Sequence, residues 1–299
     1  MVDEKKETPI GAKPIAVKRH SLYSMATIWW TCLRATKSET ICSPQLPAFE
    51  AGLQGTIPTG SDTSDLILVA CNDAYFESYA RALVNSAASV GQCLAIHIHL
   101  LEPSQKTIEE AQLLQNRHST IHLTFTVDRC EAANNLRFRN VYYTAARFLL
   151  VPSLLQRGVN RVLVIDVDTI MKNSPWPILD RIAEPHDGAF IFRRRQWKPW
   201  KKILASAVYY RSSERSLTMA SRIANSILTA LELSPRYHID QIIPHYLFRI
   251  GGHGLRSMFL NMPHDIMSYR YETSAAFWTT KGPEKRSSQF TQAKAQFET

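Results

Sequence analysis

Two aspartates, Asp166 and Asp168, close a short apolar run and are the side chains of this chain best suited to chemistry. Residues 162–165 are all apolar, and such a run predicts a buried strand. Side chains at i and i+2 leave a strand on the same face, so both carboxylates can converge while Val167 points away. Carboxylate oxygens suit Mg²⁺ or Mn²⁺, which keep open positions for the phosphates of a substrate. The alternative role is structural, as a cap for a following helix.

The elements that must position this pair alternate between strands and helices. Strands are expected over 66–71, 94–101, 120–127 and 161–165, with helices over 76–87, 104–116 and 142–156 between them. The alternation predicts an α/β domain with a largely parallel sheet and helices on both faces. Parallel strands bring their carboxyl ends to one edge, so Asn72 and Asp73 should face the same crevice as the aspartate pair. The glycine-rich segment 251–254 is expected to form a turn between strands.

Length and composition set the domain organisation and the expected compartment. In this chain of 299 residues, we expect an N-terminal extension over 1–61, partly disordered, one domain over 62–287 and a C-terminal tail over 288–299. No apolar run approaches the roughly 20 residues of a membrane span.

The start of the chain and its cysteines indicate the compartment. The acidic start has no adjoining apolar segment of the kind found in secretory signals. The five cysteines are scattered, which argues against a disulfide framework and a zinc site. We therefore expect a cytoplasmic protein.

The positive charge of the chain is concentrated in one window. The formal net charge is +9, and residues 193–202 alone hold six Lys or Arg side chains and two tryptophans. Such a cluster attracts phosphate groups of nucleic acid, anionic lipid or a phosphorylated substrate, while the alternative is a solvated basic loop. No RNA- or DNA-binding motif accompanies it, so nucleic acid is not expected. Two predictions therefore remain for residues 193–202: a peripheral contact with a membrane, or binding of a phosphorylated substrate.

Five motifs in order then resemble a known family. They are the acidic turn 70–75, an Arg-bearing helix with Arg147, the aspartate strand 162–169, an Asp-Gln pair at Asp240-Gln241, and G-P-x-K at 282–285. Together they resemble the nucleotide-sugar glycosyltransferases of the GT-A fold, most closely family 8, the glycogenin and lipopolysaccharide galactosyltransferase type. The resemblance implies a Rossmann-like α/β domain with a mixed, mostly parallel sheet flanked by helices. It also implies metal-dependent transfer of a hexose from a UDP-sugar to an unknown acceptor (a glycan, lipid or protein), with retention of anomeric configuration.

The resemblance also implies a role for each matching residue. Asp166 and Asp168 would hold Mn²⁺ or Mg²⁺ against the donor diphosphate, with Asp166 also near the ribose or sugar. Asn72 and Asp73 would contact uracil or ribose, and Arg147 the nucleotide-sugar. Asp240 and Gln241 would lie at the transferred sugar and reaction centre, while Lys285 and the Gly282 amide would bind the diphosphate.

The sequence departs from the family pattern at two places. The third metal ligand of the family is a histidine, and Thr279 occupies its position here, with His264 as the candidate substitute. Ala205-Ser206-Ala207 replaces a more polar family segment. These departures keep open a non-catalytic sugar-nucleotide-binding protein on the same fold. A D-x-D phosphatase is a further alternative, but that class needs Thr two residues after the second Asp, where Ile170 stands.

Overall fold

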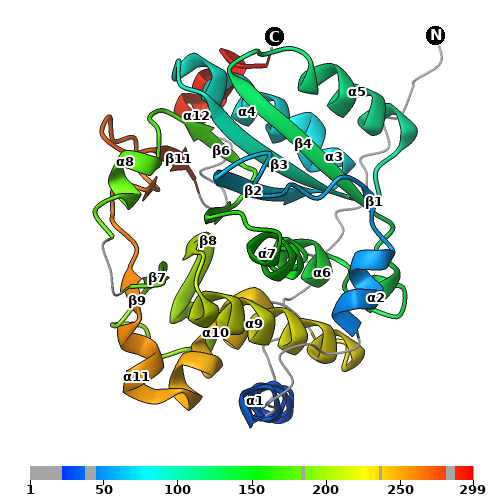
Figure 1. Ribbon diagram of the computed structural model, residues 1–299, viewed down its shortest axis with the longest axis vertical. Coiled ribbons are helices and arrows are strands. Elements are labelled where there is room, and N and C mark those ends of the chain that lie inside the picture. Colours follow the sequence, from blue (N-terminus) through cyan, green and yellow to red (C-terminus); the bar gives the residue numbers. More distant parts are fainter. Residues whose placement is uncertain (1–21, 38–44, 183–185, 236–237, 281–286, 299) are drawn as a thin grey trace, which may run out of the picture.

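The computed structural model describes residues 22–37, 45–182, 186–235, 238–280 and 287–298. In these residues an eight-stranded sheet forms the centre, with the order β1-β4-β3-β2-β5-β8-β7-β9 (Figure 1). Strands β4, β3, β2 and β5 run parallel, and β8 then pairs antiparallel with both β5 and β7. The strands are β1 (Gln54–Gly55), β2 (Asp65–Cys71), β3 (Leu94–Leu101), β4 (Ile121–Asp128), β5 (Arg161–Ile165), β7 (Gly188–Phe192), β8 (Ile203–Arg211) and β9 (Phe259–Asn261). The predicted mixed, mostly parallel sheet is confirmed.

A second, three-stranded sheet continues from the aspartate pair. Its order is β10-β11-β6, with β6 (Thr169–Met171), β10 (Met267–Ser268) and β11 (Phe277–Thr279). Residues 166–168 join β5 of the large sheet to β6 of the small one, so the two aspartates lie where the chain passes between the sheets. Across the β11/β6 pair, Thr279 stands opposite Thr169.

Helices cover both faces of the large sheet (Figure 1). One face carries α4 and α5, and the other carries α6, α7, α9 and α10, with α1 packed outside α9 and α10. The helices are α1 (Leu22–Lys37), α2 (Gln45–Ala51), α3 (Asp73–Tyr75), a π-turn (Phe76–Ala80), α4 (Arg81–Ser89), α5 (Gln105–Gln115), α6 (Asn140–Ala145), α7 (Arg147–Gln156), α8 (Trp176–Leu179), α9 (Glu214–Glu232), α10 (Ile239–Ile250), α11 (Gly252–Ser257) and α12 (Ser288–Ala295), with short 3-10 turns at Glu131–Ala133 and Pro199–Lys201.

Alternation along β2 divides the core in two. Leu66, Leu68 and Ala70 pack with α7, α9 and α10, whereas Ile67 and Val69 pack with α4 and α5. A strand covered by helices on both faces must be apolar at every position, which explains the continuous apolar run that marks β2 in the sequence. The helices present apolar faces to the sheet. Ser213 caps the start of α9, because its hydroxyl accepts the N–H of Ser216 at 3.0 Å.

Parts of both terminal segments pack on the domain. Ile28 and Cys32 of α1 are buried in the larger core, and β1 pairs with the edge strand β4. In α12, Phe290 is buried against Ile170 and Trp278. In the described residues, no helix is both long enough and apolar enough to cross a bilayer.

The glycine-rich segment 251–254 differs from its prediction as a turn between strands. It joins two helices, α10 and α11, with Gly252 at φ +67°. A residue in the left-handed conformation just past a helix end is a common helix stop, and glycine favours it. In this protein, the residue type that commonly indicates a hairpin therefore separates two helices. The break lets α11 turn back toward β9, which shapes the cavity described below.

Candidate active site

The aspartate pair lies at the carboxyl end of β5, as the strand pattern predicts. The Asp166 N–H donates to the Ser206 carbonyl of β8 at 3.3 Å, which fixes the backbone where the strand ends. The Asp166 side chain is 35 % exposed, whereas Asp168 is buried. One carboxylate of the pair is thus accessible to a ligand and the other lies beneath it.

Arg147 joins this strand end to its neighbour. It is the first residue of α7, its side chain is almost fully buried, and its guanidinium lies 2.7 Å from the Asp166 carboxylate. The same terminal nitrogen donates to the Ala205 carbonyl at 3.0 Å. A buried guanidinium needs such partners, so the contact fixes the orientation of the Asp166 carboxylate at the end of β5. Arg147 therefore lies beside the aspartate motif, and its contact with a nucleotide-sugar stays a prediction.

Asp240, in the first turn of α10, completes a charged cluster with Arg147 and Asp166. Burial raises its pKa from 3.8 to about 7, the Arg147 charge lowers it, and the nearby Asp166 charge raises it. Its Oδ1 atom is buried and has no hydrogen-bond partner among the described residues. A buried carboxyl with an unsatisfied oxygen, held beside one cation and one anion, is a group prepared to bind a ligand hydroxyl or a cation.

Gln241 follows Asp240 but its side chain binds the protein. With the amide oriented so that both ends are satisfied, its nitrogen donates to the carbonyls of Trp200 and Ile203, each at 2.9 Å, and its oxygen accepts from His238 at 3.3 Å. The amide thus holds α10 against the start of β8 and against the loop that carries the basic window 193–202, called the basic loop below. The role implied by the resemblance, with the Gln241 carbonyl toward the sugar, requires that oxygen to exchange His238 for the ligand.

Asn72 and Asp73 follow β2 at the same edge of the sheet, as predicted. The Asn72 side-chain oxygen accepts the Tyr75 N–H at 3.2 Å and caps α3. The Asp73 carboxylate accepts the Ser104 N–H at 2.9 Å. Burial alone would raise the Asp73 pKa, but this bond and those of the Ser104 and Thr107 hydroxyls outweigh it, so the pKa is lowered. Both side chains therefore brace the backbone at this edge of the sheet.

Thr279 lies next to the aspartate motif. Its hydroxyl donates to the Asp168 carbonyl at 2.9 Å, so it replaces an imidazole ligand by a backbone contact. Among the described residues, no three His, Cys, Asp or Glu side chains form a metal-binding group. His264 instead lines a cavity with Arg193, Arg194 and Arg195. The oxygen donors of Asp166 and Asp168 suit a hard cation that takes its remaining ligands from a diphosphate. Gly282 and Lys285 lie outside the described residues.

Two tyrosines near Asp166 are not among the site residues predicted from the sequence. The Tyr269 hydroxyl bonds the Ser206 hydroxyl, and burial raises the Tyr269 pKa to about 12, with Ser206 lowering and Asp166 raising it. Burial, Tyr79 and Asp166 raise the pKa of Tyr75, whose side chain is 44 % exposed. Tyr75 stands in the acidic-turn motif, which could have identified it, whereas Tyr269 precedes a loop and only the fold brings it to Asp166.

The fold is shared with solved glycosyltransferase structures. The galactosyltransferase LgtC in complex with donor and acceptor sugar analogues aligns with a TM-score of 0.56 and 14% identity, over 78% of this chain and 96% of LgtC. The apo form of the glycosyltransferase GlyE of Streptococcus pneumoniae TIGR4 aligns with a TM-score of 0.53 and 13% identity, over 79% of this chain and 60% of GlyE. No family model matches the sequence, and no curated protein matches it significantly. The predicted GT-A glycosyltransferase fold is confirmed, and at these identities the likeness concerns the fold alone.

Proposed function

We propose that this protein is a glycosyltransferase that moves a hexose from a UDP-sugar to an acceptor, with help from Mn²⁺ or Mg²⁺. The observation that carries the proposal is the cluster of Arg147, Asp166 and Asp240 at the carboxyl end of β5, in a fold shared with glycosyltransferases. Strand carboxyl ends of open α/β sheets are where ligands bind. The structure of LgtC with donor and acceptor sugar analogues shows that its fold accommodates both kinds of ligand.

Each residue of the site has a separate proposed role in the reaction. Asp166 and Asp168 would hold the cation, which when bound neutralises charge on the departing diphosphate. Arg147 keeps Asp166 turned toward the crevice through the 2.7 Å contact. Asp240 would bind hydroxyls of the transferred sugar with its unsatisfied oxygen. Asn72 and Asp73 would form the nucleoside rim, and Gly282 and Lys285 would contact the diphosphate.

Transfer would proceed with retention. The bond between the anomeric carbon and the diphosphate oxygen breaks, a bond from the acceptor oxygen to that carbon forms on the same face, and the acceptor proton passes to the leaving diphosphate. An inverting reaction needs a base on the opposite face. In the Asp-Gln pair the amide of Gln241 is too weak a base, and Asp240 is assigned to the sugar hydroxyls.

The alternative that the site supports is a sugar-nucleotide-binding protein without catalysis. Thr279 offers Asp168 only a backbone contact, and Gln241 is engaged with backbone carbonyls. Both features remove chemistry that the family pattern supplies. Binding would survive them, because the aspartates and Arg147 remain.

A panel of sugar nucleotides separates these functions. Hydrolysis or transfer is measured by UDP release with Mn²⁺, Mg²⁺ and EDTA, and UDP binding is measured by calorimetry in the same buffers. The variant Asp168→Asn should fold normally and lose at least a hundredfold in turnover, because a neutral amide does not balance a metal diphosphate. UDP binding without turnover would favour the binding protein, and the absence of both would refute the proposal.

A further inference from the structure

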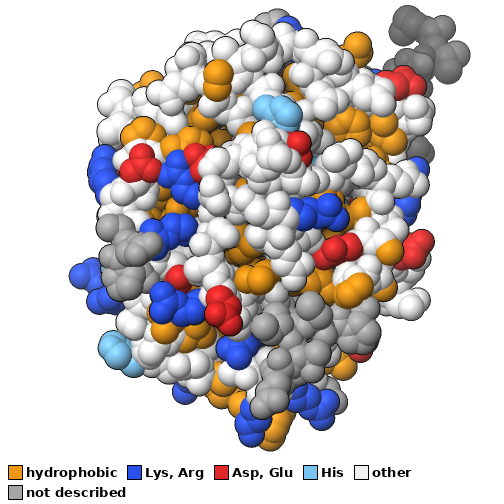
Figure 2. Space-filling view, viewed as in Figure 1, with side chains coloured by type: hydrophobic (Ala, Val, Ile, Leu, Met, Phe, Trp, Pro, Cys, Tyr) orange, Lys and Arg blue, Asp and Glu red, His pale blue; other side chains and the backbone are white. Residues whose placement is uncertain are grey.

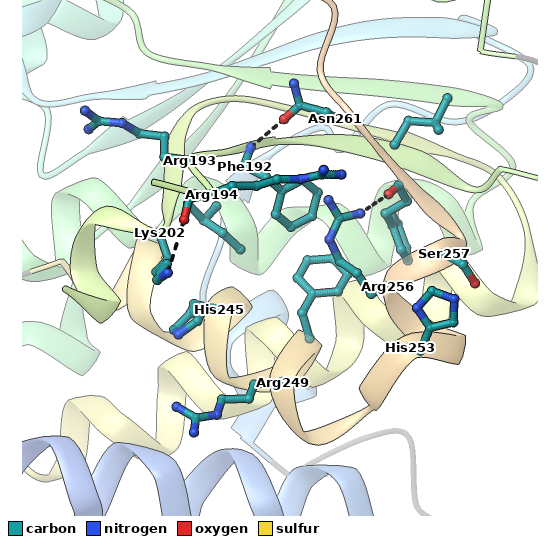
Figure 3. Close-up of a pocket in the computed structure, with 14 residues that line it drawn as sticks. Phe192, Arg193, Arg194, Lys202, His245, Arg249, His253, Arg256, Ser257 and Asn261 are labelled. Atoms are coloured by element: carbon teal, nitrogen blue, oxygen red, sulfur yellow. Dashed lines mark hydrogen bonds between the residues drawn. The ribbon is translucent and has the colours of Figure 1, made fainter. Parts of the chain in front are cut away.

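A basic cavity lies at the end of α10, beyond the candidate active site (Figure 3). Its volume is about 540 Å³. Its walls come from the end of β7 with the basic loop, from α10, from α11 and from β9. Phe192, Phe248 and Phe259 supply aromatic surface. The cations of the lining are Arg193, Arg194, Lys202, Arg249 and Arg256.

These five cations have no anionic partner in the described part of the chain. None forms an ion pair there, and no carboxylate stands among the described residues that line the cavity. Lys202 donates to the Arg194 carbonyl at 3.4 Å. Arg256 donates to the Phe259 carbonyl at 2.6 Å and its guanidinium lies 3.3 Å from the centre of the Phe192 ring. Neutral carbonyls and rings orient these side chains, and no carboxylate of the described residues balances their charge.

The cations also act on one another. Figure 3 shows the head groups of Arg194 and Arg256 close together in the middle of the cavity, and burial together with the Arg194 charge lowers the pKa of Arg256. Burial lowers the pKa of His245 to about 4, assisted by Lys202 and Arg249. Figure 3 shows the head groups of Arg193 and Arg249 turned away from the centre of the cavity, so Arg194 and Arg256 are the like charges that face each other there. Like charges that face a shared space repel, and an anion in that space would relieve the repulsion.

A second cavity extends the basic surface. It is about 490 Å³, shares Phe192, Arg193, Arg194 and Asn261 with the first, and adds Arg195. Figure 2 shows separate Lys and Arg side chains on this side of the molecule, near α11, with Asp or Glu side chains among them. A guanidinium group can donate two parallel hydrogen bonds to the oxygens of one phosphate group. Several guanidinium groups around one cavity therefore suit a doubly charged phosphate better than a singly charged carboxylate.

Helix α10 links this cavity to the candidate active site. Gln241, His245 and Arg249 are spaced four residues apart and so lie along one side of the helix, which places Arg249 about 12 Å from Gln241 along the axis. Ile203 lines the cavity, and its carbonyl accepts the Gln241 amide. A group bound in the cavity would therefore sit one or two helical turns from the proposed reaction centre.

We propose that this cavity binds the phosphate or pyrophosphate group of a phosphorylated acceptor. Anion binding stands on the cavity alone, whereas the identification of the ligand as the acceptor rests on the proposed function. The phosphate group could belong to a soluble sugar phosphate or to a lipid headgroup, and the shared chemistry is a dianion flanked by guanidinium groups.

Calorimetry with sodium pyrophosphate and the full-length protein in EDTA tests the binding. Saturable binding is expected, and the variant Arg194→Gln/Lys202→Gln should weaken it at least tenfold. The matched control Lys198→Gln/Lys201→Gln removes the same charge from the same loop outside the cavity lining, and should weaken binding less than threefold. Absence of saturable binding, or equal weakening by both variants when thermal melts show both folded, would overturn the proposal.

Two further arms locate the anion and its source. Asp168→Asn should leave pyrophosphate affinity unchanged, and a loss equal to that of the cavity variant would place the anion at the aspartates instead. Competition of hexose 6-phosphate with pyrophosphate would indicate a soluble acceptor. Binding to vesicles that contain phosphatidic acid, but not to phosphatidylcholine vesicles, would indicate a lipid if the variant Arg194→Gln/Lys202→Gln weakens it. Failure of both arms would refute the acceptor identification. Binding of UDP with Mn²⁺ in the same samples tests the proposed function separately.

Discussion

Replacing Asp240 by Asn should stabilise the ligand-free protein, and the gain should grow with pH. Burial raises the Asp240 pKa from 3.8 to about 7. Between those values the folded protein binds a proton that the unfolded chain has released, so the free energy of unfolding falls as pH rises through that window. A shift of about three pH units at about 1.36 kcal/mol per unit gives an upper limit of about 4 kcal/mol, reached above pH 7.

Asn at position 240 resembles the protonated acid and does not titrate. The variant should therefore match the wild type below about pH 4 and exceed it increasingly above that, with the advantage rising by about 2 to 3 kcal/mol between pH 5 and pH 8. Activity should fall at the same time, because Asn cannot take the charged form. Sites prepared for a ligand commonly lower stability in this way.

Urea denaturation in EDTA at pH 5, 6, 7 and 8 measures the difference. Asp62→Asn is the control, since the Asp62 carboxylate is exposed and hydrogen bonds from Thr59 lower its pKa, so this variant should gain no stability as pH rises. A pH-independent difference for Asp240→Asn, or a variant less stable than the wild type at pH 8, would refute the assignment of a buried, largely protonated Asp240.

Three further predictions concern the same cluster. Arg147→Met should cost about 2 kcal/mol in urea denaturation, less than a fully buried pair would because Asp166 is 35 % exposed, and Arg147→Met/Asp166→Asn should recover part of it; additive losses would contradict the coupling. Calorimetry should show weak Mn²⁺ binding alone and much tighter binding with UDP, since the described residues offer no three-ligand group; tight binding of the metal alone would point to a further protein ligand. Proton NMR of the product from an α-linked UDP-sugar should show an α linkage, and a β linkage would exclude the retaining mechanism.

The chain order of strands and helices was readable from the sequence because its signals are local. The apolar run before Asp166 predicts a strand that ends in two carboxylates, and the structure ends β5 at Ile165. The position of Asn72 and Asp73 at the same sheet edge followed from the parallel arrangement. The glycines at 251–254 predict a turn between strands, and this prediction is wrong, because they separate two helices. The residue type that favours a hairpin also favours a helix end.

Only the tertiary structure decided which of these groups meet. Arg147 and Asp240 lie far apart in the chain, and the packing of α7 and α10 on one face of the sheet brings both to Asp166. The β11/β6 pairing places Thr279 on the Asp168 carbonyl. The basic window was visible in the sequence, but its cavity needs α10 and α11 beside it. Composition and periodicity report on local segments. A raised pKa or a pocket lined by several cations depends on burial and on neighbours from distant parts of the chain, which only packing sets.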